Sequence, residues 1–233
     1  HRYGFNQASN AYDTLRADKN VLGILLEYET NVAHKLISRV KISSPKNYNS
    51  KDPIVSFIGA GNYASRVLIP AFKSSGAQLH TIATEGGING VFHGKRFGFI
   101  ETSTDIDHTI ENSKYNTIVI ATRHDTHARF IIKGLNNGKN IFVEKPLAIS
   151  QAELKEIKIA FSEMQNRELK SRLMVGFNRR FSPLVKKVKQ LLSADNGPKS
   201  FIMTMNAGFI PKDHWVQDRK VGGGRIIGEA CHY

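Results

Sequence analysis

Residues 55–64 have the sequence Val-Ser-Phe-Ile-Gly-Ala-Gly-Asn-Tyr-Ala, an apolar run that leads directly into a glycine-rich turn. In such a turn, Gly59 permits the tight bend, Gly61 lets the backbone approach a pyrophosphate, and the small Ala64 lets the strand and the next helix pack closely. The start of that helix offers free N–H groups and a partial positive charge to phosphates. A turn of this kind can also serve packing alone. Because a strand precedes it and a helix follows, we predict dinucleotide binding at Gly59, Gly61, Asn62, Tyr63 and Ala64.

The chain on either side alternates short apolar runs with helical stretches, which is the pattern of a parallel sheet with crossover helices. We expect strands at 54–58, 78–83, 117–121, 140–143 and 173–176, and helices near 63–74, 104–113, 126–136 and 151–165. Ser150 is expected to cap the last of these helices, with Glu153 at the capping-box position. The predicted fold class is α/β, a Rossmann-type doubly wound parallel sheet.

Turn-forming and polar residues at 43–51 mark a linker. The predicted organisation is a first segment at 1–42, a linker at 43–52, the dinucleotide-binding domain at 53–172 and a further segment at 173–233. The first segment has a helical pattern through Ala8, Ala11 and Leu15, followed by an apolar run at 21–26 that suits a buried strand. Beyond a helix that ends near residue 192, residues 200–206 have the composition of a strand.

The composition excludes several classes of protein. The chain has 233 residues, 33 Lys plus Arg against 20 Asp plus Glu for a net charge of +13, and one cysteine, which rules out a disulfide scaffold. No window approaches the roughly 18 apolar residues that cross a bilayer, and no secretion signal opens the chain, so we expect a cytoplasmic protein without a membrane partner. The positive charge is spread along the chain, and the basic run at 186–189 has no interleaved aromatic residue. We therefore expect no nucleic-acid partner.

The choice between NAD and NADP is expected to depend on the end of the second strand. An acidic residue there holds the ribose hydroxyls of NAD, whereas a basic residue favours the phosphate of NADP. Thr84 ends the strand and Glu85 follows it, while Lys95 and Arg96 come somewhat later. We predict NAD as the cofactor, with NADP as the alternative, and we count Thr84 and Glu85 among the cofactor-binding residues.

Polar residues also follow two later strands, at the sheet edge where ligands of open α/β sheets bind. The residues assigned to the cofactor there are Thr122, Arg123, His124, His127, Glu144 and Lys145. An ammonium group such as that of Lys145 can orient a substrate hydroxyl or join a proton relay as hydride leaves the carbon. His124, Asp125 and His127 could also be metal ligands, but a third or fourth ligand is not evident at a suitable spacing, so we expect no metal.

Three motifs in order resemble the Gfo/Idh/MocA oxidoreductases: the glycine turn at 59–64, the Glu-Lys-Pro triplet at 144–146, and the glycine triplet at 222–224 followed by His232. Residues 175–181 also resemble the segment with which that family enters its second domain. The resemblance covers about residues 53–233. It implies that the Rossmann-type sheet is followed, at 173–233, by the truncated start of an α+β substrate and dimerisation domain, which is incomplete in this chain. It implies an NAD- or NADP-dependent enzyme that oxidises a hydroxyl of a sugar, cyclitol or nucleotide-linked sugar, or reduces the corresponding ketone. Lys145 and His232 would be catalytic, with His232 taking the hydroxyl proton.

The resemblance further implies a set of substrate-binding residues: Lys145, Asn178, Arg179, His214, Trp215, Arg225 and His232. The sequence departs from the family pattern in two places. Many members carry an acid four residues before the histidine, where this chain has Gly228 with Glu229 beside it. Arg123 stands where a proline is common. Both departures leave the substrate class open.

The first segment resembles the carboxyl end of a medium-chain, zinc-type alcohol dehydrogenase, through residues 1–12 and 22–28. Together the two resemblances imply a bi-domain oxidoreductase that is a homo-oligomer when full length. A chain that stops at Tyr233 would lack most of the family's substrate sheet, so we expect these 233 residues to bind cofactor better than they turn over substrate. The alternative function is a non-catalytic dinucleotide-binding module or redox-sensing subunit.

Overall fold

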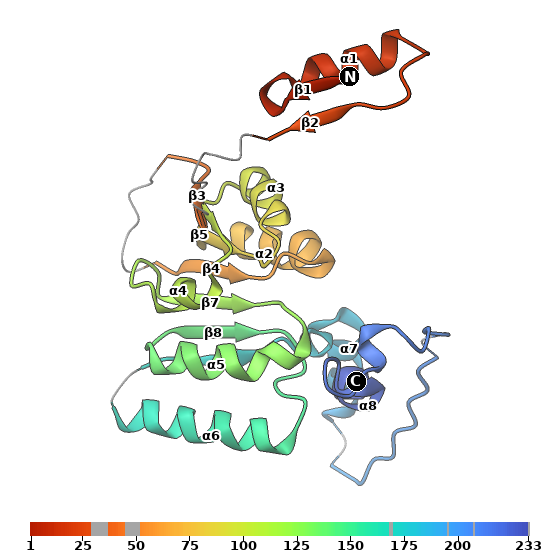
Figure 1. Ribbon diagram of the computed structural model, residues 1–233. Helices are drawn as coiled ribbons and strands as arrows, with labels where there is room; N and C mark the ends of the chain where they lie inside the picture. Colours follow the sequence, from red (N-terminus) through yellow and green to blue (C-terminus); the bar gives the residue numbers. More distant parts are fainter. Residues whose placement is uncertain (29–36, 45–51, 168–169, 195, 207, 233) are drawn as a thin grey trace. The chain divides into compact units, whose positions relative to one another are not determined.

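The computed structural model describes residues 1–28, 37–44, 52–167, 170–194, 196–206 and 208–232 (Figure 1). The chain divides into two compact units, His1–Ile37 and Ser38–Tyr233. Most of the predicted linker at 43–52 lies outside the described residues. The candidate site lies wholly in the second unit.

The second unit is built on a seven-stranded sheet in the order β3-β6-β5-β4-β7-β8-β9. Its strands are β3 (Arg39–Lys41), β4 (Ile54–Ile58), β5 (Gln78–Ala83), β6 (Glu101–Ser103), β7 (Thr117–Ile120), β8 (Asn140–Val143) and β9 (Leu173–Val175). All neighbours pair in parallel except β3, which is antiparallel to β6. The six parallel strands have the 3-2-1-4-5-6 order of a dinucleotide-binding sheet, with the reversal between β4 and β7. The predicted Rossmann-type doubly wound fold is confirmed.

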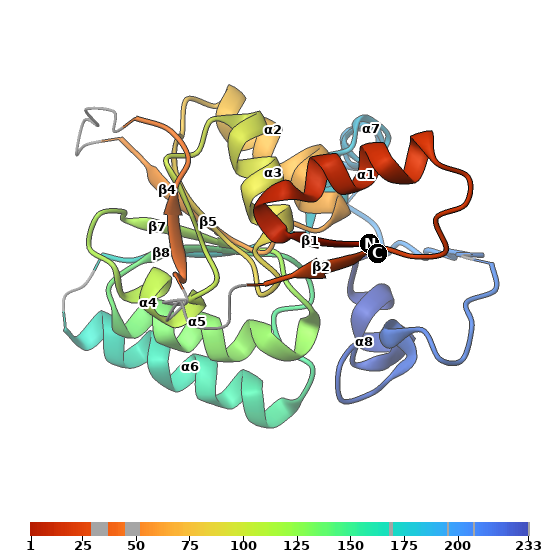
Figure 2. The ribbon, with the colours of Figure 1, turned by 45° about the horizontal axis from the view of Figure 1, so that its top comes forward.

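Helices cover both faces of this sheet (Figure 2). On one face are α2 (Ile69–Ser74) and α3 (Ile88–Phe97), and on the other are α4 (Ile106–Glu111), α5 (His127–Asn136) and α6 (Gln151–Asn166). Each face has its own apolar core. Phe57 packs edge-on against Phe72 and Phe99 in the first core, and Ile118, Ile131 and related side chains fill the second. Full burial of a side chain of this size contributes roughly 1.5–3 kcal/mol.

Local signals in the sequence fix the starts of these helices. Ser150 and Glu153 form the predicted capping box at the start of α6. The predicted helix at 63–74 begins instead as a π-helical turn, Ala64–Leu68, before α2. Pro70 at the start of α2 has no N–H to donate to the carbonyl four residues earlier, so the preceding turn widens.

Three elements of the Rossmann sheet and its covering helices were not predicted: β3, α3 and β6. The glycines at 90 and 94 reduce the helical signal of α3, yet Gly94 is required because a Cβ there would lie 2.3 Å from the side chain of Ile42. β6 is polar but buried, so it lacks a strand's usual apolar pattern. β3 lies in the region that we assigned to the first segment. It belongs to the sheet, where Arg39 pairs with the buried Glu101 at 3.9 Å.

Two other expectations were wrong in detail. Residues 200–206 have no regular structure, and Phe201 and Ile202 are exposed, because no described strand lies beside them to pair with. In the first unit, the helical pattern forms α1 (Ala8–Ala17) as expected. The strand predicted at 21–26 is the shorter β2 (Leu25–Glu27), which pairs in parallel with β1 (Arg2–Gly4), and Leu25 is exposed rather than buried.

The chain after β9 collects at the carboxyl ends of the parallel strands (Figure 1). It contains the 3-10 helix Asn178–Phe181, α7 (Pro183–Leu192), the 3-10 helix Trp215–Gln217, α8 (Gly224–Glu229) and the 3-10 helix Ala230–His232. The predicted helix after Ser182 is confirmed, with the Ser182 hydroxyl accepting from the N–H of Val185 at 3.2 Å. This segment therefore forms a wall opposite the glycine turn.

Gly59→Ala is expected to destabilise the protein by about 3 kcal/mol, because Gly59 has φ +97° and a Cβ there would lie 2.4 Å from the Ala121 carbonyl oxygen. Gly61→Ala is the matched control, since a Cβ at Gly61 has nothing within 4 Å and the change should cost less than about 1 kcal/mol. Urea unfolding followed by circular dichroism measures both. Equal stabilities for the two variants would contradict the account of this turn.

Candidate active site

A cavity of about 380 Å³ lies where the strand order reverses, at the carboxyl ends of β4, β7 and β8. Ligands of open α/β sheets bind at such a point. Its lining comes from the glycine turn, the loops after β7 and β8, and the segment after β9. The lining residues are Gly61, Asn62, Tyr63, Ala64, Ala121, Thr122, His124, Glu144, Lys145, Asn178, Trp215 and His232. All but Ala121 were predicted as site residues.

The glycine turn forms one wall of this cavity. A Cβ at Gly61 would meet open space, so the backbone there is accessible to a ligand. The side-chain N–H of Asn178 donates to the Tyr63 hydroxyl at 2.5 Å, which connects the turn to the segment after β9. Burial raises the pKa of Tyr63, and the neighbouring charge of Glu144 raises it further. Tyr63 therefore faces this cavity as a neutral phenol.

Glu144 provides a buried acceptor in the same cavity. Its Oε1 is buried and makes no hydrogen bond to any described residue. Room for this carboxyl group depends on Gly176, because a Cβ there would lie 2.7 Å from Oε1. Burial raises the pKa of Glu144. A buried acceptor without a partner costs about 1–3 kcal/mol, which a hydroxyl donor from a ligand can recover. Together with the open backbone at Gly61, this arrangement fits a dinucleotide.

Lys145 is fixed by the backbone of α8. Its Nζ donates to the Gly228 carbonyl at 2.8 Å. Two further hydrogen bonds hold the segment before α8 to the loop after β7: His124 Nδ1 lies 2.8 Å from the Gly222 carbonyl, and the Asp125 N–H donates to the Val221 carbonyl at 3.1 Å. These three bonds bring His232, which follows α8, into the cavity that Lys145 lines.

The glycine triplet permits this docking. A Cβ at Gly222 would lie 2.6 Å from both Cα and O of Val216, so the two backbones approach more closely than any side chain allows. Gly223 and Gly224 have φ of +77° and +75°, a region that favours glycine. The triplet therefore turns the chain sharply into α8 while packing against the 3-10 helix at Trp215.

His127 has a structural position rather than one in the cavity. It is fully buried, and its ring nitrogens lie 2.7 Å from the Pro146 carbonyl and 3.2 Å from the Thr122 carbonyl. Both partners are acceptors, so the neutral ring donates to one of them, and the shorter distance favours Pro146. Burial lowers the pKa of His127. The ring thus joins the two loops that carry Thr122 and Lys145.

The remaining predicted site residues lie outside the lining: Gly59, Thr84, Glu85, Arg123, His127, Arg179, His214 and Arg225. Thr84 and Glu85 are in the turn after β5, at the same sheet edge. Arg123 lies over the ring of Trp215 at 6.0 Å, and His214 Nδ1 accepts from the N–H of Val216 at the start of a 3-10 helix. Ala121 was missed, because an alanine carries no chemical signal in a sequence.

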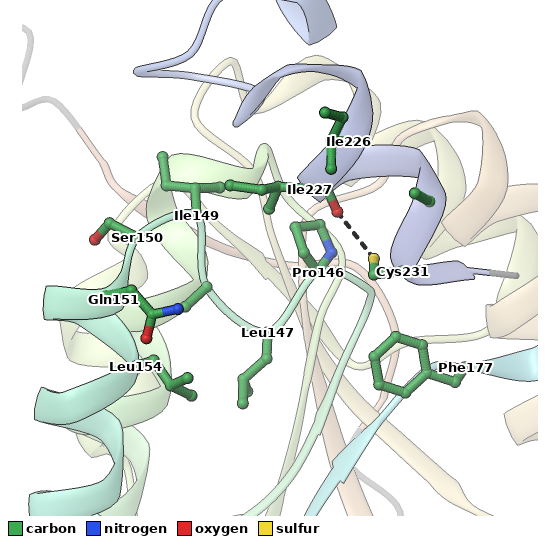
Figure 3. Close-up of a pocket in the computed structure, with 12 residues that line it drawn as sticks. Pro146, Leu147, Ile149, Ser150, Gln151, Leu154, Phe177, Ile226, Ile227 and Cys231 are labelled. Atoms are coloured by element: carbon green, nitrogen blue, oxygen red, sulfur yellow. Dashed lines mark hydrogen bonds between the residues drawn. The ribbon is translucent and has the colours of Figure 1, made fainter.

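A second cavity, of about 480 Å³, was also missed (Figure 3). It lies on the other side of Pro146, between residues 146–151 and α8. Its walls are mostly apolar, including Leu147, Ile226 and Ile227, and the Cys231 thiol at its rim donates to the Ile227 carbonyl at 2.9 Å. Each of these residues is ordinary in sequence, so only the fold brings them together.

Within the residues that the structure describes, no group of three or more His, Cys, Asp or Glu side chains is placed to hold a metal ion. His124, Asp125 and His127 therefore do not converge on one point. No described helix combines the length and apolar character needed to cross a bilayer.

The chain belongs to the Gfo/Idh/MocA oxidoreductases. The model of that family, described as an oxidoreductase family with an NAD-binding Rossmann fold, matches residues 54–176, more than half of the chain. Residues 54–176 thus form an NAD-binding Rossmann domain of that oxidoreductase family, and they include the glycine turn at 59–64 and the Glu-Lys-Pro triplet at 144–146. The preceding zinc-type dehydrogenase that we inferred for residues 1–42 is not shown by any comparison.

Two curated relatives illustrate the family. Oxidoreductase P35 of Formosa agariphila is 25% identical over 193 residues, covering 76% of this chain and 59% of that protein. The scyllo-inositol 2-dehydrogenase (NAD(+)) of Bacillus subtilis is 36% identical over 100 residues, covering 43% of this chain and 28% of that protein. The chain thus spans well under two thirds of the length of either relative.

A solved structure supports the same fold. The scyllo-inositol dehydrogenase of Lactobacillus casei, crystallised with NAD(H) and scyllo-inositol, superposes with a TM-score of 0.55 at 20% identity. The match covers 62% of this chain and 42% of that one. At this identity the likeness establishes the fold and leaves the substrate open.

The free energy of unfolding is expected to fall as the pH is lowered from about 7 to 5. The folded-state pKa of His127 lies below the unfolded value of 6.5, so below that pH the unfolded chain binds a proton that the folded chain does not. Urea unfolding at pH 7.5, 6.0 and 5.0 measures this trend. His127→Asn retains a donor for Pro146 but cannot be protonated, and should flatten the dependence. If the free energy of unfolding of that variant has the same pH dependence as the wild type, other titratable groups cause the dependence.

Proposed function

We propose that this chain is the cofactor-binding and catalytic part of an NAD-dependent dehydrogenase that acts on a hydroxyl of a sugar, cyclitol or nucleotide-linked sugar, or on the corresponding ketone. One observation carries the proposal: Lys145 and His232 line the same cavity as the glycine turn. A module that only bound nucleotide would need neither side chain there. The similarity to scyllo-inositol 2-dehydrogenase, at 36% identity over 100 residues, supports a polyol substrate.

In this proposal the nicotinamide, when bound, supplies the hydride acceptor. Lys145 holds the substrate hydroxyl, with its own position set by the Gly228 carbonyl. His232 takes the hydroxyl proton. Burial lowers the pKa of His232, and the charges of Lys145 and Arg179 lower it further, so the ring is neutral near pH 7 and ready to accept a proton. Glu144 receives a hydroxyl of the cofactor at its buried oxygen.

The preference for NAD rests on the geometry of α3. Lys95 and Arg96 lie in its last turn, about 10 Å along the axis from the turn that holds Glu85 at a rise of 1.5 Å per residue. Arg96 lies over the ring of Phe97 at 5.3 Å. Glu85 lies two residues beyond the end of β5, where an acid favours the ribose hydroxyls of NAD.

The domain assignment is part of the same proposal. Residues 173–233 begin the substrate domain, because they supply Asn178, Trp215 and His232 to the cavity. For residues 1–42, the order of helix α1 and strand β2 is what the resemblance to a zinc-type dehydrogenase predicts, although Arg39–Lys41 belongs to the Rossmann sheet. In this view the full-length protein is a cytoplasmic homo-oligomer of two dehydrogenase domains.

Titration with NADH, followed by nicotinamide fluorescence, tests the cofactor site. The wild type should bind. Gly61→Trp should lose binding at least tenfold without unfolding, because its side chain enters the open space that we assign to the pyrophosphate. Lys145→Met separates enzyme from binding module: NADH affinity should change by less than threefold, while NAD+ reduction with scyllo-inositol should fall about 10²-fold or more. NADH binding without any reduction by the wild type, even in a single turnover, would favour the non-catalytic module.

Glu85→Arg is expected to reverse the cofactor preference, lowering the affinity for NADH and raising that for NADPH so that their ratio changes at least tenfold. The substitution removes the acceptor for the ribose hydroxyls and supplies a partner for the 2′-phosphate. Parallel titrations with both nucleotides measure the ratio. Lys95→Met is the control and should leave the ratio unchanged. A loss of NADPH binding in that control would instead place the phosphate at the end of α3.

A further inference from the structure

The ring of His124 is held in one tautomer. Its Nδ1 lies 2.8 Å from the Gly222 carbonyl oxygen, which can only accept a hydrogen bond. Nδ1 therefore carries the proton, and Nε2 of the neutral ring presents a lone pair. The Gly222 carbonyl belongs to the same docked segment that brings His232 into the cavity. The polarity of Nε2 is thus set by the fold.

The surroundings of His124 keep the ring neutral. Burial is the main cause that lowers its pKa, and the charge of Lys145 lowers it further. His127, with its ring centroid 5.7 Å away, is itself neutral, while Asp125 and Glu229 act in the opposite direction. Near pH 7 Nε2 is consequently an acceptor and not a donor.

This acceptor has no partner in the described residues. His124 is 7% exposed and lines the cavity, yet the only hydrogen bond of its ring within the described part of the chain is the one to Gly222. A nitrogen acceptor that a ligand can reach gains a hydrogen bond only from a donor. The group that meets Nε2 must therefore be a hydrogen-bond donor.

The structure also shows why the ring fits there. A Cβ at Gly228 would lie 3.2 Å from Cε1 and 3.5 Å from Nδ1 of His124. The ring of Trp215 packs edge-on against the imidazole, with centroids 4.9 Å apart. A side chain at 228 would thus press on the imidazole. The imidazole lies in the space beside α8 that such a side chain would enter.

We propose that His124 is a specificity-determining residue whose Nε2 accepts a hydrogen bond from a substrate hydroxyl. The site then selects a polyol that presents a hydroxyl at this point and disfavours a ligand that presents a carboxylate or ketone there. This inference rests on the proposed function and deepens it. It also differs from our assignment of His124 to the cofactor, since the donor that it meets belongs to the substrate.

The ring nitrogens can be observed directly by 15N NMR of the 233-residue protein at pH 7.5, with His124 assigned through His124→Asn. Nδ1 should give a protonated signal and Nε2 an unprotonated one. In the NADH complex, scyllo-inositol should shift the Nε2 signal toward the hydrogen-bonded range, whereas NADH alone should not. A proton on Nε2 overturns the proposal, as does an Nε2 signal that does not respond to scyllo-inositol or glucose at saturating NADH.

Binding measurements give an independent readout. His124→Asn keeps a side-chain N–H for the Gly222 carbonyl but removes the acceptor, so scyllo-inositol affinity for the NADH complex should fall about tenfold while NADH affinity changes by less than twofold. His108→Asn, at an exposed position on α4, is the matched control and should match the wild type. A tenfold loss of NADH affinity with His124→Asn would make the ring a cofactor contact and overturn the proposal. Failure of the wild type to bind NADH would instead contradict the proposed function.

Discussion

The close approach of the turn after β4 to the end of β7 is the constraint on which the rest of the site depends. The Gly59 N–H donates to the Ala83 carbonyl at 2.8 Å, and its Cα lies so close to the Ala121 carbonyl that no Cβ fits. This contact sets the first helix beside the point where the strand order reverses. The open backbone at Gly61 then faces the loops after β7 and β8, so that the glycine turn, Lys145 and His232 share one cavity.

The positions of Lys145 and His124 beside α8 depend on backbone carbonyls rather than on charge pairs. Lys145 and His124 each bind a carbonyl of the segment at 222–228, and both side chains are thereby held at fixed distances from α8. A neutral acceptor leaves the ammonium charge of Lys145 available to a substrate, whereas a carboxylate partner would compete for it. The three glycines at 222–224 make such close backbone contact feasible. The packing of α8 and the position of Lys145 therefore depend on the same residues.

The sequence predicted this fold where its signals were local. Three features can be recognised from a few consecutive residues: the glycine turn, the apolar strands and the capping box at Ser150. Each is present in the structure as predicted. β6 and α3 were missed because buried polar residues and interior glycines conceal the usual periodicity. Residues 200–206 have the composition of a strand, but a strand also needs a neighbouring strand to pair with. Amino-acid composition carries no information about such a partner. The motifs predicted most of the residues that line the first cavity. The second cavity, beyond Pro146, forms through tertiary packing alone, so no motif indicated it.

The orientation of His124 illustrates what motifs omit. A histidine after a strand can be a donor, an acceptor or a cation, and these three states select different ligands. The choice is made 98 residues later in the chain, by the Gly222 carbonyl. Gly228 leaves room for the ring in this orientation, because a Cβ there would lie 3.2 Å from Cε1 and 3.5 Å from Nδ1 of His124. A side chain at 228 would therefore press on a ring whose tautomer the fold has set.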